Sequence, residues 1–237
     1  MHVKELKWVS IDRSLIVGGT DMGILMGVNK WKSRDELIKE KLGELVVEDN
    51  DAMYWGRMAE PMVAEHIKNN LDDDYYLFNP VNTRLPVYRC RYLRAQSQIE
   101  HPHYPFIVGS PDRLVLEKNT HEVIEGIEIK TAYEWTLKKW KVSPPDYHLM
   151  QMQTYMMCTG LEEWRCCCLV GNRTYIEHVV EADHLLQDEM VEKAIEFHAE
   201  LNEIIKQQAQ GALEKYEQAI TIKDEDKEEV CITMGKN

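Results

Sequence analysis

Apolar and polar residues alternate in two short runs near the middle of the chain. Residues 113–117 read RLVLE and residues 124–130 read IEGIEIK. A period of two is typical of a strand with one buried face. Asn119, Thr120 and His121, between the runs, are turn-forming residues. The pattern therefore predicts an antiparallel hairpin.

Further elements are predicted on both sides of this hairpin. Apolar residues at helical spacing predict helices over residues 33–43, 51–69 and 146–160, and a long one from residue 183 onward. Strand-like runs lie at residues 75–79, 84–96, 106–108, 164–170 and 175–180. The Ser33–Glu36 pair is a capping box, and Gly171–Asn172 is a turn signal between the last two strands.

The length of 237 residues suits one domain, which we place at residues 1–210. Residues 211–237 are rich in charge, and KDEDKEE within them indicates a solvated, poorly ordered C-terminal tail. The N-terminus has no signal-peptide core and no apolar run reaches membrane-spanning length, so we expect an intracellular, cytoplasmic protein.

Candidate chemistry lies at the two ends of the hairpin. Glu128 and Lys130 are two residues apart on one predicted strand, so their side chains leave the same face. Antiparallel pairing would bring Asp112 beside them. Two converging carboxylates form a hard-oxygen site of the kind that Mg²⁺ accepts, and Lys130 could then orient or help deprotonate an attacking water. The alternative is an ordinary polar hairpin with its charges in water.

Other polar residues could complete such a site. Glu60 precedes Pro61, where the helix should kink or begin afresh, and its carboxylate could be a third acidic group. Gln151 and Tyr155 are four residues apart and share a helix face. Gln151 could bond the water or a phosphate. Each of these side chains could equally be a solvated surface group.

A possible phosphate site lies near the N-terminus. Gly18 and Gly19 precede Thr20 and Asp21, either of which could cap a short helix whose free amides bind anions. Arg13, seven positions before Thr20, could contact the same phosphate. A plain loop-to-helix turn is the alternative.

The net charge of −13 argues against a general nucleic-acid coater, because such proteins bind through many phosphate contacts. Positive charge is nevertheless concentrated in two places. One is a strand-like run with Arg84, Arg89, Arg91 and Arg94, and the other is Lys138, Lys139 and Lys141 around Trp140. Both could face DNA, and both could be solvated surfaces.

The six cysteines include no CxxC pair, so neither a zinc ribbon nor a disulfide framework is indicated, and buried thiols in a reducing compartment are the simpler interpretation. His101 and His103 form a His-x-His pair without further ligands nearby. We therefore assign them to a loop.

Several motifs, in this order, carry a family resemblance. They are Arg13-x6-Thr20, W-G-x3-E-P at residues 55–61, S-P-D at 110–112, E-I-K at 128–130 and Q-x-Q-x-Y at 151–155. From about residue 13 to residue 180 the chain resembles the lambda-exonuclease-like, YqaJ-type viral recombinases among the PD-(D/E)XK nucleases. The resemblance implies an α/β (α+β) fold with a restriction-endonuclease-like core, a central mixed β-sheet flanked by helices.

The resemblance also implies roles. Asp112 and Glu128, with the Ile129 carbonyl, look like Mg²⁺ ligands, and Glu60 like the helical acid that completes the metal shell. Mn²⁺ is the expected substitute. Lys130 and Gln151 look like the residues that hold the nucleophilic water, with Tyr155 beside them. Arg13 and Thr20 fall where the family grips a terminal 5′ phosphate. Arg113 departs from the pattern, which has Gly there, and it could face the scissile phosphate or point into solvent.

The implied reaction is processive 5′→3′ hydrolysis of linear duplex DNA, which releases mononucleotides and leaves a 3′ single strand for recombination. The resemblance further implies a homotrimer and a single-strand annealing partner. Three alternatives stay open: a structure-specific or restriction-type endonuclease, a RecB-like nuclease with an iron–sulfur cluster, which the cysteine spacing does not support, and an inactive scaffold that binds DNA ends.

Overall fold

A computed structural model describes residues 1–9, 11–80 and 98–234, with side chains described up to residue 214. The chain divides into two compact units, Met1–Ile195 and Glu196–Asn237. Every strand among the described residues lies in the first unit. The predicted strand over residues 84–96, with its four arginines, lies outside the described residues.

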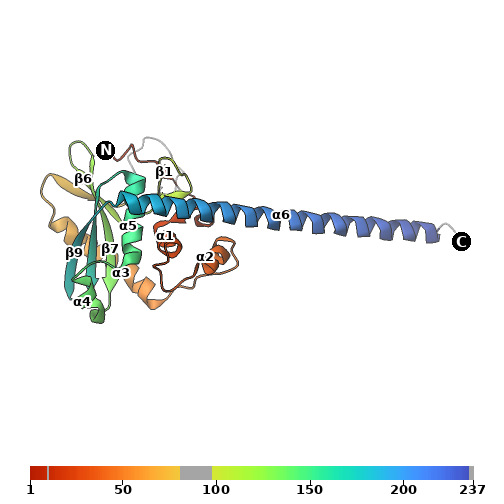
Figure 1. Ribbon diagram of the computed structural model, residues 1–237, viewed down its shortest axis with the longest axis horizontal. Coiled ribbons are helices and arrows are strands. Elements are labelled where there is room, and N and C mark those ends of the chain that lie inside the picture. Colours follow the sequence, from red (N-terminus) through yellow and green to blue (C-terminus); the bar gives the residue numbers. More distant parts are fainter. Residues whose placement is uncertain (10, 81–97, 235–237) are drawn as a thin grey trace. The chain divides into compact units, whose positions relative to one another are not determined.

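The elements follow one another in the order shown in Figure 1. The strands are β1 Trp8–Val9, β2 Val17–Gly18, β3 Tyr75–Phe78, β4 Gln98–Glu100, β5 Ile107–Gly109, β6 Arg113–Glu117, β7 Val123–Ala132, β8 Glu163–Val170 and β9 Thr174–Glu181. The helices are α1 Gly19–Leu25, α2 Arg34–Lys41, α3 Asp51–Asn69, α4 Leu137–Trp140, α5 Asp146–Thr159 and α6 His184–Met234, with short 3-10 turns at Arg13–Leu15 and Glu134–Thr136.

The main sheet has the order β3-β6-β7-β8-β9. It is mixed, because β7 and β8 are parallel while the other neighbours are antiparallel. The predicted hairpin is confirmed as β6 and β7, with Arg113 paired with Ile127. A smaller sheet has the order β1-β4-β5-β2. The predicted mixed sheet flanked by helices is therefore confirmed.

Alternation along β7 gives the main sheet two different faces. Ile127 and Ile129 pack with Val63, Ala64 and Ile67 of α3. Glu128 and Lys130, one residue out of phase, leave the opposite face. On that opposite face, Trp164 of β8 contacts the ring of Tyr155 from α5, with 5.2 Å between ring centroids. Helix α3 thus covers one face of β7, and α5 lies over the face that carries Glu128 and Lys130.

Three helix boundaries differ from the predictions. Helix α3 continues through Pro61 without a break. Helix α1 begins at Gly19, so Gly18 is its N-cap, and Asp21 accepts a hydrogen bond from the Gly18 amide over 2.9 Å. Neither Thr20 nor Asp21 is the cap. Helix α6 does not stop near Gly211 but continues to Met234. The division into a domain at residues 1–210 and a tail stays a prediction.

The cysteines that the structure describes are Cys158, Cys166, Cys167 and Cys168, all free and buried. This agrees with the expectation of small buried thiols. Among the described residues, no helix is both long enough and apolar enough to cross a membrane.

A glycine in β7 allows the sheet to bury its largest side chain. A Cβ at Gly126 would lie 2.3 Å from ring atoms of Trp164, which is fully buried. We predict that Gly126→Ala lowers the free energy of unfolding by about 1–3 kcal/mol, because the Trp164 ring must shift. Urea denaturation measures this.

Gly211→Ala is the matched control, since no atom lies within 4 Å of the added Cβ in α6. Alanine is the better helix former, so this variant should be as stable as the wild type or slightly more stable. Equal stability of Gly126→Ala and Gly211→Ala would contradict the close packing at Trp164.

Candidate active site

Asp112, Glu128 and Lys130 meet where β6 and β7 come together. Asp112 directly precedes β6, one step beyond the Arg113–Ile127 pair, so it lies opposite Glu128. Its Oδ2 accepts the backbone N–H of Ile129 over 2.8 Å. Lys130 Nζ forms an ion pair with Glu128 Oε1. The structure therefore brings together the three side chains that the hairpin pattern had placed near one another.

Burial dominates the electrostatics of this cluster. The Glu128 side chain is 0% exposed. Burial first, and then the neighbouring Asp112 carboxylate, raise the pKa of Glu128 to about 8 against the opposing effect of Lys130. Burial also raises the pKa of Asp112. For Lys130, burial lowers the pKa, but attraction to Glu128 and Asp112 outweighs it, and the net shift is upward.

The carboxylates of this cluster fit a divalent cation. Within the described part of the chain, neither oxygen of Glu128 has a hydrogen-bond partner, although Lys130 lies close enough for an ion pair. When both carboxyl groups are ionised, they carry one negative charge more than the Lys130 ammonium balances, and carboxylate oxygens are ligands that Mg²⁺ prefers. A cation held by Asp112 and Glu128 would neutralise this charge.

Glu60 is not part of a three-acid cluster. No group of three or more His, Cys, Asp and Glu side chains among the described residues is arranged to hold a metal ion. Instead, Glu60 Oε1 accepts a hydrogen bond from Arg113 Nη1 over 2.6 Å. Glu60 lies near enough to Asp112 to raise its pKa slightly, after larger effects from burial and Lys130. It is an outer neighbour of the cluster.

Arg113 adopts neither of the two orientations expected from the sequence. Its side chain is only 6% exposed, so it does not point into solvent. The guanidinium Nη1 donates to Glu60 and also to the backbone carbonyl of Asp112, over 2.5 Å. Arg113 thus ties α3 to the start of β6 and is engaged with protein groups rather than free to face a phosphate.

Gln151 and Tyr155 lie on the side of α5 next to the cluster. Gln151 Nε2 donates to the Tyr155 hydroxyl over 2.5 Å. Burial raises the pKa of Tyr155 well above its ordinary value, and the charges of Glu128 and Asp112 raise it further. Tyr155 is therefore a neutral phenol within the electrostatic range of both carboxylates. The predicted pair on one helix face is present.

Two glycines let α5 approach this region. A Cβ at Gly19 would lie 2.8 Å from the Gln151 side chain and 3.1 Å from the Tyr155 ring. A Cβ at Gly109 would lie 3.1 Å from the same ring. Larger residues at either position would push α5 away from its neighbours, so these glycines help to set the position of Gln151.

Arg13 and Thr20 are exposed side chains on a backbone that Lys41 holds in place. Lys41 is buried, and its Nζ donates to the Arg13 carbonyl over 2.6 Å and to Asp21 Oδ2 over 2.7 Å. Thr20 follows Gly19, which contacts Gln151 and Tyr155. Lys41 was not singled out in the sequence, because a lysine in the last turn of a helix normally lies in solvent.

His148 was also missed. It precedes Gln151 by one helical turn, and its Nδ1 is buried without a hydrogen-bond partner among the described residues. Burial lowers the pKa of His148 well below its ordinary value, and the charge of Lys130 lowers it further. The ring is therefore a neutral imidazole near Lys130. The i, i+3 spacing to Gln151 was its one visible signal.

The remaining candidate residues from the sequence are the histidine pair and the lysine cluster. His101 is buried, and its Nδ1 accepts the backbone amides of His103 and Tyr104, each over 3.1 Å. Burial and the nearby His103 lower the pKa of His101 to about 4. The assignment of this pair to a loop is consistent with these contacts. Lys138, Lys139 and Lys141 are exposed, while Trp140 between them is buried.

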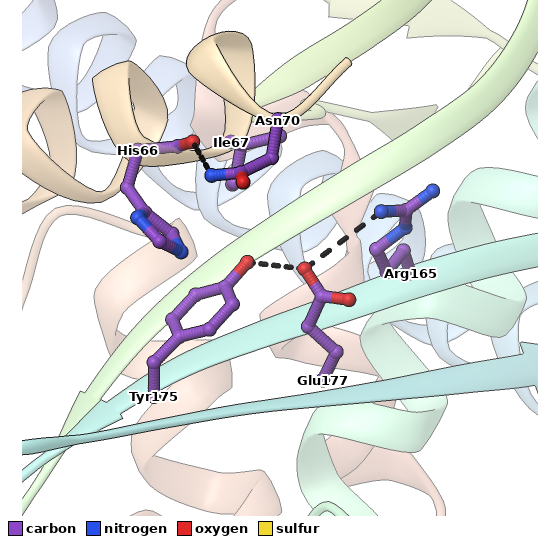
Figure 2. A pocket seen from close by; sticks show the side chains of 6 residues that line it. All are labelled: His66, Ile67, Asn70, Arg165, Tyr175 and Glu177. Atoms are coloured by element: carbon purple, nitrogen blue, oxygen red, sulfur yellow. Dashed lines mark hydrogen bonds and ion pairs between the residues drawn. The ribbon is translucent and has the colours of Figure 1, made fainter. Parts of the chain in front are cut away.

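A separate hollow of about 410 Å³ lies between α3 and strands β8 and β9. Figure 2 shows Arg165 and Tyr175 both directed toward Glu177. Arg165 also makes two hydrogen bonds to Glu125, over 2.8 and 2.5 Å. Since two carboxylates already neutralise this guanidinium, the hollow is a poor site for a phosphate.

Comparisons with known proteins find relatives of this chain in sequence and in fold. A family model described as a YqaJ-like viral recombinase domain matches residues 7–162. "Uncharacterized protein YqaJ" of Bacillus subtilis (strain 168) is 27% identical over 196 residues, which are 81% of this chain and 54% of that protein. The chain thus spans about half the length of the curated relative that it matches.

Two solved exonucleases share the fold. LHK-Exo, an alkaline exonuclease from Laribacter hongkongensis that was also solved in complex with dAMP, is 24% identical, with a TM-score of 0.64 over 85% of this chain and 95% of its own. A phage related exonuclease from Haemophilus somnus 129PT is 14% identical, with a TM-score of 0.58 over 82% and 96%. At these identities the likeness shows the fold.

The Arg113–Glu60 contact gives a stability prediction. Arg113→Met keeps the buried stem but removes the donor to Glu60 and to the Asp112 carbonyl. Because Glu60 is 31% exposed and partly hydrated, we expect a modest loss, about 1–2 kcal/mol of unfolding free energy. A double-mutant cycle with Glu60→Gln measures the part that belongs to the pair.

Arg57→Met is the control, because Arg57 of α3 pairs with Asp49, which precedes the helix, and both side chains are about half exposed. Its loss should be smaller than that of Arg113→Met. A loss in Arg113→Met no larger than in Arg57→Met, with no coupling to Glu60, would contradict a structural role for the buried guanidinium.

Proposed function

Because the chain belongs to the YqaJ-like viral recombinase domain family, we propose that it is a metal-dependent deoxyribonuclease. The observation that carries this proposal is the buried pair of carboxylates, Asp112 and Glu128, beside the ammonium of Lys130. Burying two carboxyl groups beside a single ammonium is costly, and a bound cation would offset that cost. The fold shared with two exonucleases adds support.

Each side chain then has a role. Asp112 and Glu128, with the Ile129 carbonyl, hold Mg²⁺, or Mn²⁺ in its place. The bound cation supplies positive charge that polarises the phosphodiester and favours deprotonation of water. Glu60, linked to Arg113, bonds water in the outer shell of the site. None of these groups needs to move far, since Asp112 is already fixed by the Ile129 amide.

Lys130, Gln151 and Tyr155 position the nucleophile. Lys130 keeps its positive charge, because the two carboxylates raise its pKa. Its ammonium can donate to the attacking water and stabilise the negative charge that develops on the phosphate oxygens. The Gln151 amide bonds the same water, and the Tyr155 hydroxyl, which accepts from Gln151 Nε2, fixes the orientation of the amide.

Arg13 and Thr20 bind the terminal 5′ phosphate of the DNA. Their side chains are exposed, and the Lys41 bridge between the Arg13 carbonyl and Asp21 keeps both backbones in one arrangement. A site that binds the 5′ end of a strand sets the direction of digestion. We therefore propose 5′→3′ digestion of linear duplex DNA that leaves a 3′ single strand. A ring-shaped homotrimer would make digestion processive, and an annealing protein in the same cell would receive the strand for phage-type recombination.

Cleavage assays with Mg²⁺ test this function. Glu128→Gln preserves the shape of the buried side chain but removes its charge, so we expect cleavage of 5′-phosphorylated linear duplex to fall by about 100-fold or more. Glu65→Gln, on the exposed surface of α3, is the control and should cleave normally. Removal of the 5′ phosphate should slow wild-type digestion, and covalently closed circular duplex should stay intact.

Three outcomes would contradict parts of the proposal. Full activity of Glu128→Gln would remove the assigned chemistry. Cleavage of closed circles by the wild type would indicate an endonuclease on the same fold. Binding of DNA ends without turnover in Mg²⁺ or Mn²⁺ would indicate a scaffold.

A further inference from the structure

A second groove, of about 790 Å³, lies between the first half of α3 and the segment that follows β7. One wall consists mainly of Trp55, Met58 and Met62 from α3, and the facing wall includes Thr131, Tyr133 and Glu134. None of these residues has a part in the chemistry proposed above.

The α3 wall is apolar and faces water. Trp55, Met58 and Met62 are 64%, 57% and 58% exposed. Their spacing of three and four residues places them on one side of the helix, while Val63, Ala64 and Ile67 form the side that packs on the sheet. An exposed stripe of large apolar side chains indicates a surface that binds a partner.

Tyr133 of the facing wall stacks on Trp135, which lies next to the groove lining in the chain and is not part of it. Tyr133 and Trp135 lie 4.2 Å apart between ring centroids and are nearly parallel, at 8°. They are 56% and 77% exposed. The segment is held firmly, since the Trp140 carbonyl bonds His178 Nε2 over 2.6 Å and Glu134 lies against Gly171. Rigid, exposed, flat rings are the surface on which nucleic-acid bases stack.

The charges next to the rings suit a phosphate backbone. Lys138, Lys139 and Lys141 are all exposed and follow Trp135 directly in the chain. Residues 133–142 contain these three lysines and one acid, Glu134, in a protein whose net charge is −13. Because Asp51 and Glu134 line the groove itself, phosphates are disfavoured inside it, so the bases would enter the groove and the backbone would lie outside.

The groove and the carboxylate cluster are built from the same two elements but lie on different faces of the sheet. Thr131 follows Lys130 on β7 and, one residue out of phase with it, faces α3. On α3, Glu60 lies between Ala59 and Met62, which both line the groove.

We propose that this groove binds single-stranded DNA by stacking unpaired bases on Trp55 and on the Tyr133–Trp135 pair. The proposal rests on the proposed nuclease function and adds a separate binding site for the unpaired strand, on the α3 side of the sheet. It explains why these aromatic and methionine side chains are left in water rather than packed in the core.

Fluorescence anisotropy of a dye-labelled oligothymidine of about twelve nucleotides tests the groove. The titration contains EDTA, so that neither cleavage nor metal binding contributes. Trp55→Ala and Trp135→Ala should each raise Kd by about 5-fold to 100-fold, as expected for the loss of one stacked base. Leu185→Ala, which truncates an 85% exposed apolar side chain outside the groove, should bind as the wild type does.

A salt titration distinguishes the contribution of the aromatic rings to binding from that of the lysine charges. Lys138→Gln with Lys139→Gln should lower the slope of log K against log salt by about 0.7 for each lost phosphate contact, whereas Trp135→Ala should leave the slope unchanged. Thermal melting of each variant checks the fold, which substitution at these exposed positions should preserve.

Wild-type affinity in both tryptophan variants would overturn the proposal. A change in the sedimentation mass of these variants, with oligonucleotide binding intact, would overturn it as well and would make the groove an interface between copies of the chain. If the wild type cleaves no DNA but loses oligonucleotide affinity when either tryptophan is replaced, the groove proposal is supported and the nuclease function fails. If the wild type cleaves DNA normally but its oligonucleotide affinity does not depend on the tryptophans, the nuclease function is supported and the groove proposal fails.

Discussion

Two carboxylates and one ammonium lie together on one face of the main sheet, where β6 begins beside β7, and the neighbouring strands and helices hold them there. The β6–β7 register sets Asp112 opposite Glu128, and the Ile129 amide fixes Asp112. Burial raises the pKa of both carboxyl groups, and the Asp112 carboxylate raises the pKa of Glu128 further. A protein keeps such a cluster only with a function for it, and binding a divalent cation would relieve the excess charge.

Helices α3 and α5 contribute to the site in different ways. Helix α3 supplies apolar residues to one face of the sheet and brings Glu60 to Arg113, so the guanidinium joins the helix to the strand that starts beside Asp112. Helix α5 lies over the other face and presents Gln151 and Tyr155. Its close approach needs glycine at position 19. Function and packing are thus coupled, because changes that move either helix also move groups around the carboxylates.

Local patterns predicted the parts of the site that depend on local geometry. Alternation sufficed for the β6–β7 hairpin, and a spacing of four residues sufficed for the Gln151–Tyr155 pair. Long-range pairing was not predictable: nothing near Arg113 in the sequence indicates a partner 53 residues earlier. Helical periodicity also gives a face without saying which side is buried, so it does not show that Met58 of α3 lines a groove while Ile67 packs in the core. Likewise, charge in residues 211–234 did not predict a continuous helix, because a polar sequence can be helical without packing in a core.

Calorimetric titration of the metal-free protein with Mn²⁺, without DNA, tests the central claim most directly. If Asp112 and Glu128 together hold the cation, the wild type binds with measurable heat, and Asp112→Asn and Glu128→Gln each weaken binding by about tenfold or more, since each removes one charged ligand. Both variants must retain the wild-type circular dichroism spectrum. Equal Mn²⁺ affinity in the wild type and in Glu128→Gln would contradict the account.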